Sequence, residues 1–353
     1  MKNSLAVLPG VCVLACISLL FTGSAPAVGA GDSAGCEHPA PTAQYELQLQ
    51  TGETHAGTRI RPATERVEAT PETIAEAMGQ LEHNAKEECR QWADKAFEEF
   101  EQSAYKEPFP GGKYIVSGDI AISDRQRLRE FFELRIKRES SETVPEALIV
   151  HKVGGREAIW DSTRRKHLTY CVSSTFGDWQ KQVIKDMKAA TGAWEAVADV
   201  QFIHVAAEDA DCTPSNANVV FDIRPVDVDG QYLARAFFPN EERAERNLLI
   251  DESSFHLDTG GALQLVGILR HELGHTLGWR HEHTRPESGT CFEDNNWRPL
   301  TDYDRFSVMH YPQCNGGADW SLKLTHLDKN GAACVYGAAP GFHIDPQICQ
   351  ERA

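Results

Sequence analysis

Residues 271–281 read HELGHTLGWRH, and this stretch decides the fold. Apolar residues recur on one side of a predicted helix that begins after Thr259 and carries the stretch. On such a helix His271 and His275 lie one turn apart on the same face, so both imidazoles can reach one metal ion. Glu272 is offset by one position, where it can reach a water on that metal. Two histidines at this spacing can also be an ordinary solvated pair, so the residues that follow are needed to decide.

Gly278 and His281 extend the pattern beyond a bare pair. Glycine accepts the left-handed backbone conformation, so the chain can leave the helix axis at Gly278 and bring His281 back as a third nitrogen ligand. Three histidines leave one coordination position for water, which is the arrangement of a catalytic zinc site rather than a structural one. The sequence therefore predicts one Zn²⁺ on His271, His275 and His281, with Glu272 as the general base.

Residues 307–312 read SVMHYP. Together with the histidine motif they resemble the metzincin metallopeptidases, in which HExxHxxGxxH is followed by a methionine-containing turn. The HEHTR that starts at His281 and the SxMHY of the turn resemble the astacin branch, whereas segments 233–238 and 324–337 are matrixin-like. The resemblance implies that Met309 forms a hydrophobic base under the zinc. It also implies that Tyr311 ligates the zinc at rest and swings away to stabilise the oxyanion.

Strands and helices alternate from about Leu148 onward, which predicts an α/β (α+β) domain around one sheet. Strands are expected at 168–172, 200–205, 218–223, 233–238 and 248–251, with a long helix at 179–197. The metzincin resemblance implies one mixed twisted sheet, an active-site helix and a Met-turn. An extended substrate is expected to add as an antiparallel strand to an edge strand that contains Leu233, Ala234, Arg235, Ala236 and Phe237. A plain sheet edge without a binding role is the alternative.

The first thirty residues predict export. Lys2, the apolar stretch from Leu5 to Phe21 and the small residues up to Ala30 have the layout of a signal peptide. A membrane anchor is the alternative, but the stretch is short for a span and contains proline and glycine. A lipid anchor on Cys16 would be followed by apolar residues, which argues against it. We therefore expect a secreted protein without stable membrane association.

Cysteine usage agrees with export. The chain has ten cysteines, and removal of residues 1–30 takes Cys12 and Cys16 and leaves eight. An even number in an oxidising compartment predicts disulfides, and the sequence alone does not select the pairing. We expect Cys36 and Cys89 to stay apart from the six later cysteines.

Residues 31–145 are predicted to be a mainly helical propeptide, followed by a catalytic domain over 146–353. An acidic amphipathic helix is expected over 72–107, a short strand over 113–116 and a second helix from about Asp124. Gly118-Asp119 resembles part of the astacin propeptide element in which an aspartate occupies the water position on zinc. This resemblance makes Asp119 the expected latency ligand. A cysteine switch through Cys89 is the alternative, but the Pro-Arg-Cys-Gly context is missing.

Charge and composition limit the partners. With 52 acidic against 35 basic side chains, the chain has a formal charge of −17 and would repel phosphates, which argues against nucleic acid. We expect a monomer that acts on protein or peptide substrates. Asp227–Gly230 could line a Ca²⁺ loop, but a polar turn before the edge strand explains these residues better. The predicted function is a secreted zinc endopeptidase made as a zymogen, and the alternative is a catalytically silent zinc-containing binding protein of metzincin fold.

Overall fold

The computed structural model describes residues 90–139 except 92, 148–257, 262–293, 296–317 and 319–349. The chain divides into two compact units, 1–36 and 37–353, and all described residues belong to the second. The predicted signal peptide, Cys36, Cys89 and the first part of the predicted propeptide therefore lie outside the described residues. The domain boundaries at 30 and 145 stay predictions.

A five-stranded mixed sheet forms the centre of the larger part, in the order β7-β6-β8-β10-β9. Strands β6, β7, β8 and β10 are parallel, whereas β9 pairs antiparallel with β10 at the edge. The bounds are β6 Leu168–Val172, β7 Phe202–His204, β8 Phe221–Val226, β9 Ala234–Arg235 and β10 Asn247–Asp251. All five predicted strands are present, and the predicted mixed sheet is confirmed. The edge strand is shorter than predicted, since only Ala234 and Arg235 hold the ladder with Ile250 and Leu249.

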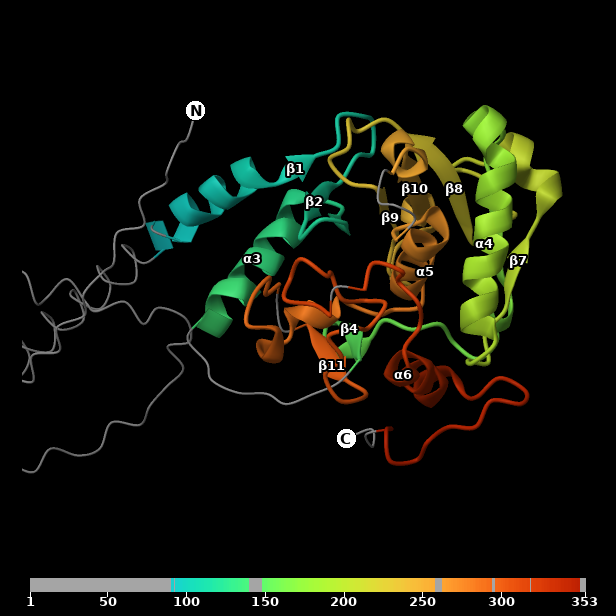
Figure 1. Cartoon of the computed structure of the whole chain (residues 1–353). Helices are drawn as coiled ribbons and strands as arrows, with labels where there is room; N and C mark the ends of the chain where they lie inside the picture. The colour runs from blue at the N-terminus through green and yellow to red at the C-terminus, as the bar shows by residue number, and fades with distance from the viewer. Residues whose placement is uncertain are drawn as a thin grey trace, which may run out of the picture. The chain divides into compact units, whose positions relative to one another are not determined.

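Two helices, α4 (Gln180–Glu195) and α5 (Leu265–Thr276), lie side by side against this sheet (Figure 1). The helix α4 buries Val183, Met187, Ala190 and Trp194, which recur at helical spacing. Their partners in the core include Leu269 and Leu273 of α5 and Ile223 and Ile250 of the sheet. The core therefore fixes α5, the helix that carries the histidine motif, on two sides.

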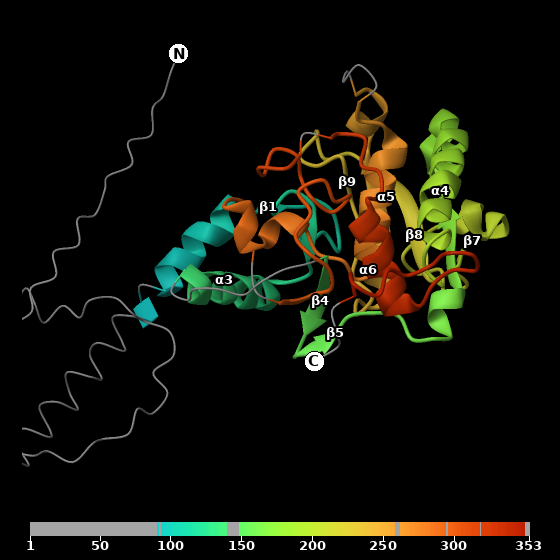
Figure 2. The same cartoon turned by 60° about the horizontal axis from the view of Figure 1, so that its bottom comes forward.

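The remaining elements surround the end of α5 (Figure 2). A small sheet of order β11-β4-β5 contains β4 (Ile149–Val153), β5 (Arg156–Glu157) and β11 (Trp297–Pro299), none of which the sequence predicted as a strand. The helix α6 (His326–Tyr336) starts with a capping box between Thr325 and Asp328.

The described part of the predicted propeptide folds around its own small core. Helical residues span 93–103, strands β1 (Tyr105–Lys106), β2 (Tyr114–Val116) and β3 (Ile120–Ile122) form a sheet, and α3 spans Arg125–Glu139. The expected helix over 72–107 is therefore wrong at its end, because Tyr105 and Lys106 pair with β2 instead. The core of this part contains Phe97, Leu128 and Phe132, together with Phe238 from the predicted catalytic domain.

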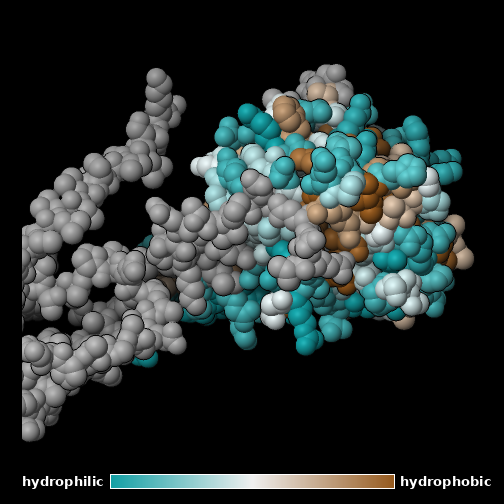
Figure 3. All heavy atoms as spheres, turned by 90° about the horizontal axis from the view of Figure 1, so that it is seen from below, coloured by the Kyte–Doolittle hydropathy of each residue, from teal (hydrophilic) through white to brown (hydrophobic). Residues whose placement is uncertain are grey.

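Six cysteines form three disulfides, Cys171–Cys212, Cys291–Cys314 and Cys334–Cys349. The expectation that the later six cysteines pair among themselves is confirmed. The face of the molecule in Figure 3 is mostly hydrophilic, with a smaller hydrophobic area. Among the helices that the structure describes, none combines the length and the apolar character needed to cross a membrane.

Candidate metal centre and active site

The helix α5 places His271, Glu272 and His275 in the interior, and all three are almost completely buried. The helix ends at Thr276, and Gly278 follows with φ of 96°. A Cβ at this position would lie 2.4 Å from the backbone oxygen of Ala158, so both the conformation and the close approach require glycine. The chain then turns back and brings His281 to the two helical histidines, as the motif predicted.

The Nε2 atoms of the three histidines converge. The Nε2 of His281 lies 3.1 Å from that of His271 and 3.2 Å from that of His275. Ligands at about 2.1 Å around one tetrahedral zinc ion lie about 3.4 Å from one another, so the spacing fits a shared ion. The histidine donor set is also one that zinc prefers.

The other ring nitrogens are held by acceptors. The Nδ1 of His271 donates to the backbone oxygen of Val308, and that of His275 donates to the backbone oxygen of Trp279, each at 2.7 Å. The Nδ1 of His281 contacts a carboxylate oxygen of Glu293. Because Nδ1 carries the proton, each Nε2 presents a lone pair to the centre. Three lone pairs that face one another without a proton are favourable only around a cation, so the residues fit zinc.

The Met-turn lies beneath this centre. Met309 is fully buried, and its Sδ occupies the space that a Cβ on Gly274 would need, at 2.3 Å. The turn also supplies the Val308 oxygen that holds His271. Asp328 of α6 fixes the turn, since its carboxylate accepts from the Ser307 hydroxyl at 2.5 Å and from the Val308 amide at 2.8 Å.

A matrixin family model matches residues 160–288, the region from the sheet to just beyond the third histidine. The histidine motif, its convergent nitrogens and the Met-turn agree with this match. The chain is similar to the metzincins.

Two further comparisons found similar proteins. The chain is 32% identical over 102 residues to astacin-like metalloprotease toxin 2 of Loxosceles intermedia, across 24% of this chain and 40% of that relative. The chain thus matches less than half of that relative's length. Among solved structures it matches high choriolytic enzyme 1, a hatching enzyme zinc-protease from Oryzias latipes, the medaka fish. That match has 17% identity and a TM-score of 0.34, and it covers 53% of this chain and 98% of that one.

The carboxylate of Glu272 has no hydrogen-bond partner at Oε2, although the side chain is buried. Burial raises the pKa of Glu272 well above its ordinary value, and the charge of Asp119 raises it further. An orphaned buried carboxylate oxygen beside three convergent histidines is suited to accept a proton from a water held there.

Asp119 of the predicted propeptide lies against the three histidines. Its Oδ1 is 2.9 Å from Nε2 of His281, and its Oδ2 is 3.2 Å from Nε2 of His271 and 3.8 Å from that of His275. The four residues thus form one buried group with the spacing of metal ligands. Burial raises the pKa of Tyr311 well above its ordinary value, and the nearby Asp119 carboxylate raises it further. The Tyr311 ring packs against His281 with centroids 4.5 Å apart.

The predicted substrate strand is an edge of the main sheet, but its residues differ in exposure. The side chain of Arg235 is buried, and Glu107 of the predicted propeptide binds it. A cavity beside the strand is lined by Tyr232, Leu233 and Ala234 and reaches His271, Glu272 and Tyr311. Ala236 and Phe237 are buried in the core, so neither is open to a substrate in this structure.

Two residues of the site were not predicted from the sequence. Glu293 is fully buried behind His281, and His283 stacks on His281 with centroids 4.6 Å apart. The position of His283, two residues after a ligand, is a weak signal that could have suggested a role. Glu293 has no such signal, because it follows His281 at no periodic spacing and lies outside any helix or strand.

Asp227–Gly230 forms a polar turn, in which Asp229 and Gly230 have positive φ. Among the described residues, the groups with metal-ligand spacing are Asp119 with the three histidines, and His281 with His283 and Glu293. The turn belongs to neither, so the structure gives no support for calcium there.

Proposed function

We propose that this protein is a secreted zinc endopeptidase that hydrolyses peptide bonds of proteins and is made as a latent zymogen. The observation that carries the proposal is the convergence of three Nε2 lone pairs next to the unpartnered carboxylate oxygen of Glu272. A binding protein of the same fold needs the three histidines but has no use for a buried glutamate without a partner.

A zinc ion held by His271, His275 and His281 would supply Lewis acidity, which acidifies a bound water to a pKa of about 7 and polarises a peptide carbonyl. Glu272 accepts the proton of the attacking water and passes it to the nitrogen of the leaving amine. Its raised pKa suits both steps, since the group must take up and then release a proton near neutral pH.

Tyr311 is proposed to stabilise the oxyanion. Its hydroxyl lies beside Gly118, and Tyr311 lines the same cavity as Asp119 and His271. After Asp119 leaves, the same hydroxyl faces the place where negative charge develops on the substrate oxygen. The cavity that Ala234 and Leu233 share with Glu272 is proposed to hold the substrate, which adds to β9 as an antiparallel strand.

Latency is proposed to depend on Asp119. Its carboxylate faces all three histidines, so it would occupy the coordination position that a catalytic water needs. Gly118, with φ of 98°, allows the close approach, because a Cβ there would lie 2.9 Å from the Tyr311 hydroxyl. Removal of residues 31–145 would then open the site.

Secretion is supported by the three disulfides, which persist in oxidising compartments. The layout of residues 1–30 is that of a signal peptide. The acidic surface and the protease family favour protein substrates over nucleic acid, and we propose a monomer.

The test is casein digestion by the secreted full chain before and after limited proteolysis, with and without a zinc chelator. Glu272→Gln should abolish digestion while zinc stays bound, and the exposed Glu252→Gln should digest casein like the wild type. Rapid digestion by Glu272→Gln would contradict the mechanism. A chain that binds zinc but digests nothing after processing would favour the binding protein.

Latency is tested separately. Asp119→Asn in the unprocessed chain should raise basal digestion at least about tenfold, because an amide is a poor zinc ligand. Asp178→Asn, which changes an exposed aspartate, is the matched control. Unchanged basal activity of Asp119→Asn would remove Asp119 from this role.

A further inference from the structure

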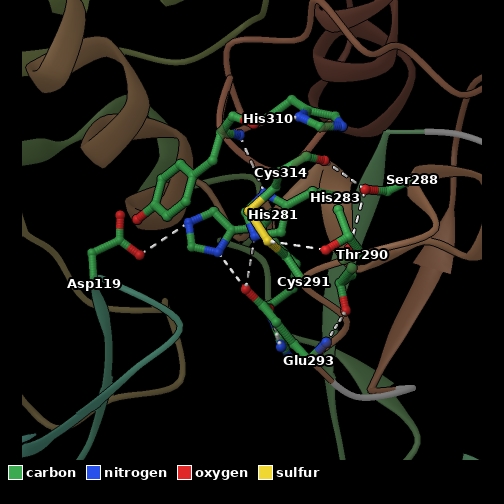
Figure 4. A network of polar contacts seen from close by, with 12 residues as sticks. Asp119, His281, His283, Ser288, Thr290, Cys291, Glu293, His310 and Cys314 are labelled. Carbon is green, nitrogen blue, oxygen red and sulfur yellow. Dashed lines mark hydrogen bonds and ion pairs between the residues drawn. A yellow bond between two sulfur atoms is a disulfide. The ribbon is translucent and has the colours of Figure 1, made fainter. Parts of the chain in front are cut away.

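The third histidine is held differently from the first two. His271 and His275 donate through Nδ1 to backbone oxygens, which the fold fixes. His281 donates through Nδ1 to a side chain, the carboxylate of Glu293 (Figure 4). The orientation of His281 therefore depends on where Glu293 lies.

Glu293 is fully buried, and several groups position its carboxylate. Its Oε2 accepts from the Arg280 guanidinium at 2.6 Å, and its Oε1 lies 3.5 Å from Nε2 of His283. Its backbone amide donates to the Thr284 hydroxyl at 3.0 Å. These contacts connect Glu293 to the residues on both sides of His281 in the sequence.

The segment that carries Glu293 has no helix or strand of its own over 289–293. A covalent bond holds it instead, because Cys291 is bonded to Cys314, three residues beyond Tyr311. The Ser288 hydroxyl lies 3.1 Å from the backbone oxygen of Thr290 and 2.8 Å from that of Cys314, so its single proton can be donated to either (Figure 4). The disulfide thus fixes the Glu293 segment to the chain that follows the Met-turn.

We propose that Glu293 is a positioning residue for the metal centre, a role that rests on the proposed function as a zinc enzyme. Its carboxylate holds the Nδ1 proton of His281, so that Nε2 stays unprotonated and aimed at the ion. The Cys291–Cys314 disulfide keeps the carboxylate in place.

The test measures zinc affinity of the secreted full chain by competition with a chromogenic chelator, so no peptide hydrolysis is needed. Glu293→Gln keeps the volume and removes the charge, and it should weaken zinc binding about 10-fold; Glu293→Ala should weaken it up to about 100-fold. The exposed Glu252→Gln should bind zinc like the wild type. A double change of Cys291 and Cys314 to serine should give a zinc affinity between those of the wild type and Glu293→Ala.

Cobalt substitution gives a second readout, since a displaced His281 changes the visible absorption of bound Co²⁺, which loss of stability alone does not. Zinc affinity of Glu293→Gln within about twofold of the wild type, with an unchanged cobalt spectrum, overturns the proposal even if Glu293→Ala does not fold. Tight zinc binding by a chain that shows no proteolysis would reject the proposed enzyme function. The zinc affinities of the Glu293 variants would still test the positioning role.

Discussion

Glu107 and Arg235 form a buried bidentate ion pair between the predicted propeptide and the edge strand β9. The Nε of Arg235 donates to one carboxylate oxygen at 2.7 Å, and a terminal nitrogen donates to the other at 2.9 Å. The Tyr232 hydroxyl adds a third hydrogen bond at 2.5 Å. The predicted propeptide thus contacts the rest of the chain at a second place, separate from the contact of Asp119 with the histidines.

Glu107→Gln should weaken this attachment. The Arg235 guanidinium would stay buried without a counter-charge, which costs about 3 kcal/mol. We expect a lower free energy of unfolding in denaturant and faster release of activity during limited proteolysis. The exposed Glu98→Gln is the control, and equal stability of the two variants would contradict the prediction.

Gly274→Ala should destabilise the protein through the Met-turn. The new Cβ would overlap Met309, and such overpacking costs about 2 kcal/mol. Gly192→Ala is a matched control in α4, where nothing lies within 4 Å of the added atom, and it should be neutral or slightly stabilising. Thermal unfolding of both variants measures the difference, and a smaller loss for Gly274→Ala than for Gly192→Ala would refute the overlap.

Tyr311→Phe should reduce kcat without releasing zinc. The change removes only the hydroxyl, and loss of one oxyanion donor typically lowers kcat about 100-fold. The three histidines would still bind the ion. Peptide kinetics and metal content of the processed chain test this, and an unchanged kcat would exclude Tyr311 from catalysis.

Stability should fall as pH rises through the range in which Glu241 ionises. Burial raises the pKa of Glu241 to about 7, and a shared hydrogen bond with Glu245 adds to the effect; Lys113 and Arg127 also face this carboxylate. The folded chain therefore binds a proton that the unfolded chain releases near pH 4.5, so this contribution is complete below pH 4.5 and lost above pH 7.

Denaturant unfolding at pH 5 and pH 7.5 measures that contribution. Between pH 5 and pH 7.5, the free energy of unfolding should fall by about 2 kcal/mol more for the wild type than for Glu241→Gln. Glu242→Gln, one residue further and exposed, should behave like the wild type. An equal change in the free energy of unfolding for the wild type and Glu241→Gln would contradict the raised pKa of Glu241.

The convergence of the three histidines could be predicted from the sequence because these residues are close together along the chain. Their spacing by one helical turn places His271 and His275 on the same face of α5. Gly278 indicates the turn that brings His281 back to them. The main sheet was also predictable, since β6 and β10 are apolar runs with clear ends.

Contacts between distant segments could not be predicted. Arg235 was expected to lie along a bound substrate, but its partner is Glu107, and no local pattern relates residues so far apart. Glu293 is held by tertiary contacts and a disulfide rather than by a helix or strand, so periodicity carries no information about it. Strand β4 was missed for a similar reason, because its ladder with β11 joins residues far apart in the sequence, such as Val150 and Arg298.

The hydrogen bonds between Asp328 and the Met-turn bear on when the histidine centre can form during synthesis. Ser307 and Val308 are bonded to a carboxylate in the first turn of α6, and Val308 in turn orients His271. The first histidine is therefore aimed by a residue that is translated 57 positions after it. We therefore expect metal loading to be a late event, completed only when the chain beyond Asp328 has left the ribosome. Chains that end before Asp328 would carry the whole motif but should bind zinc weakly.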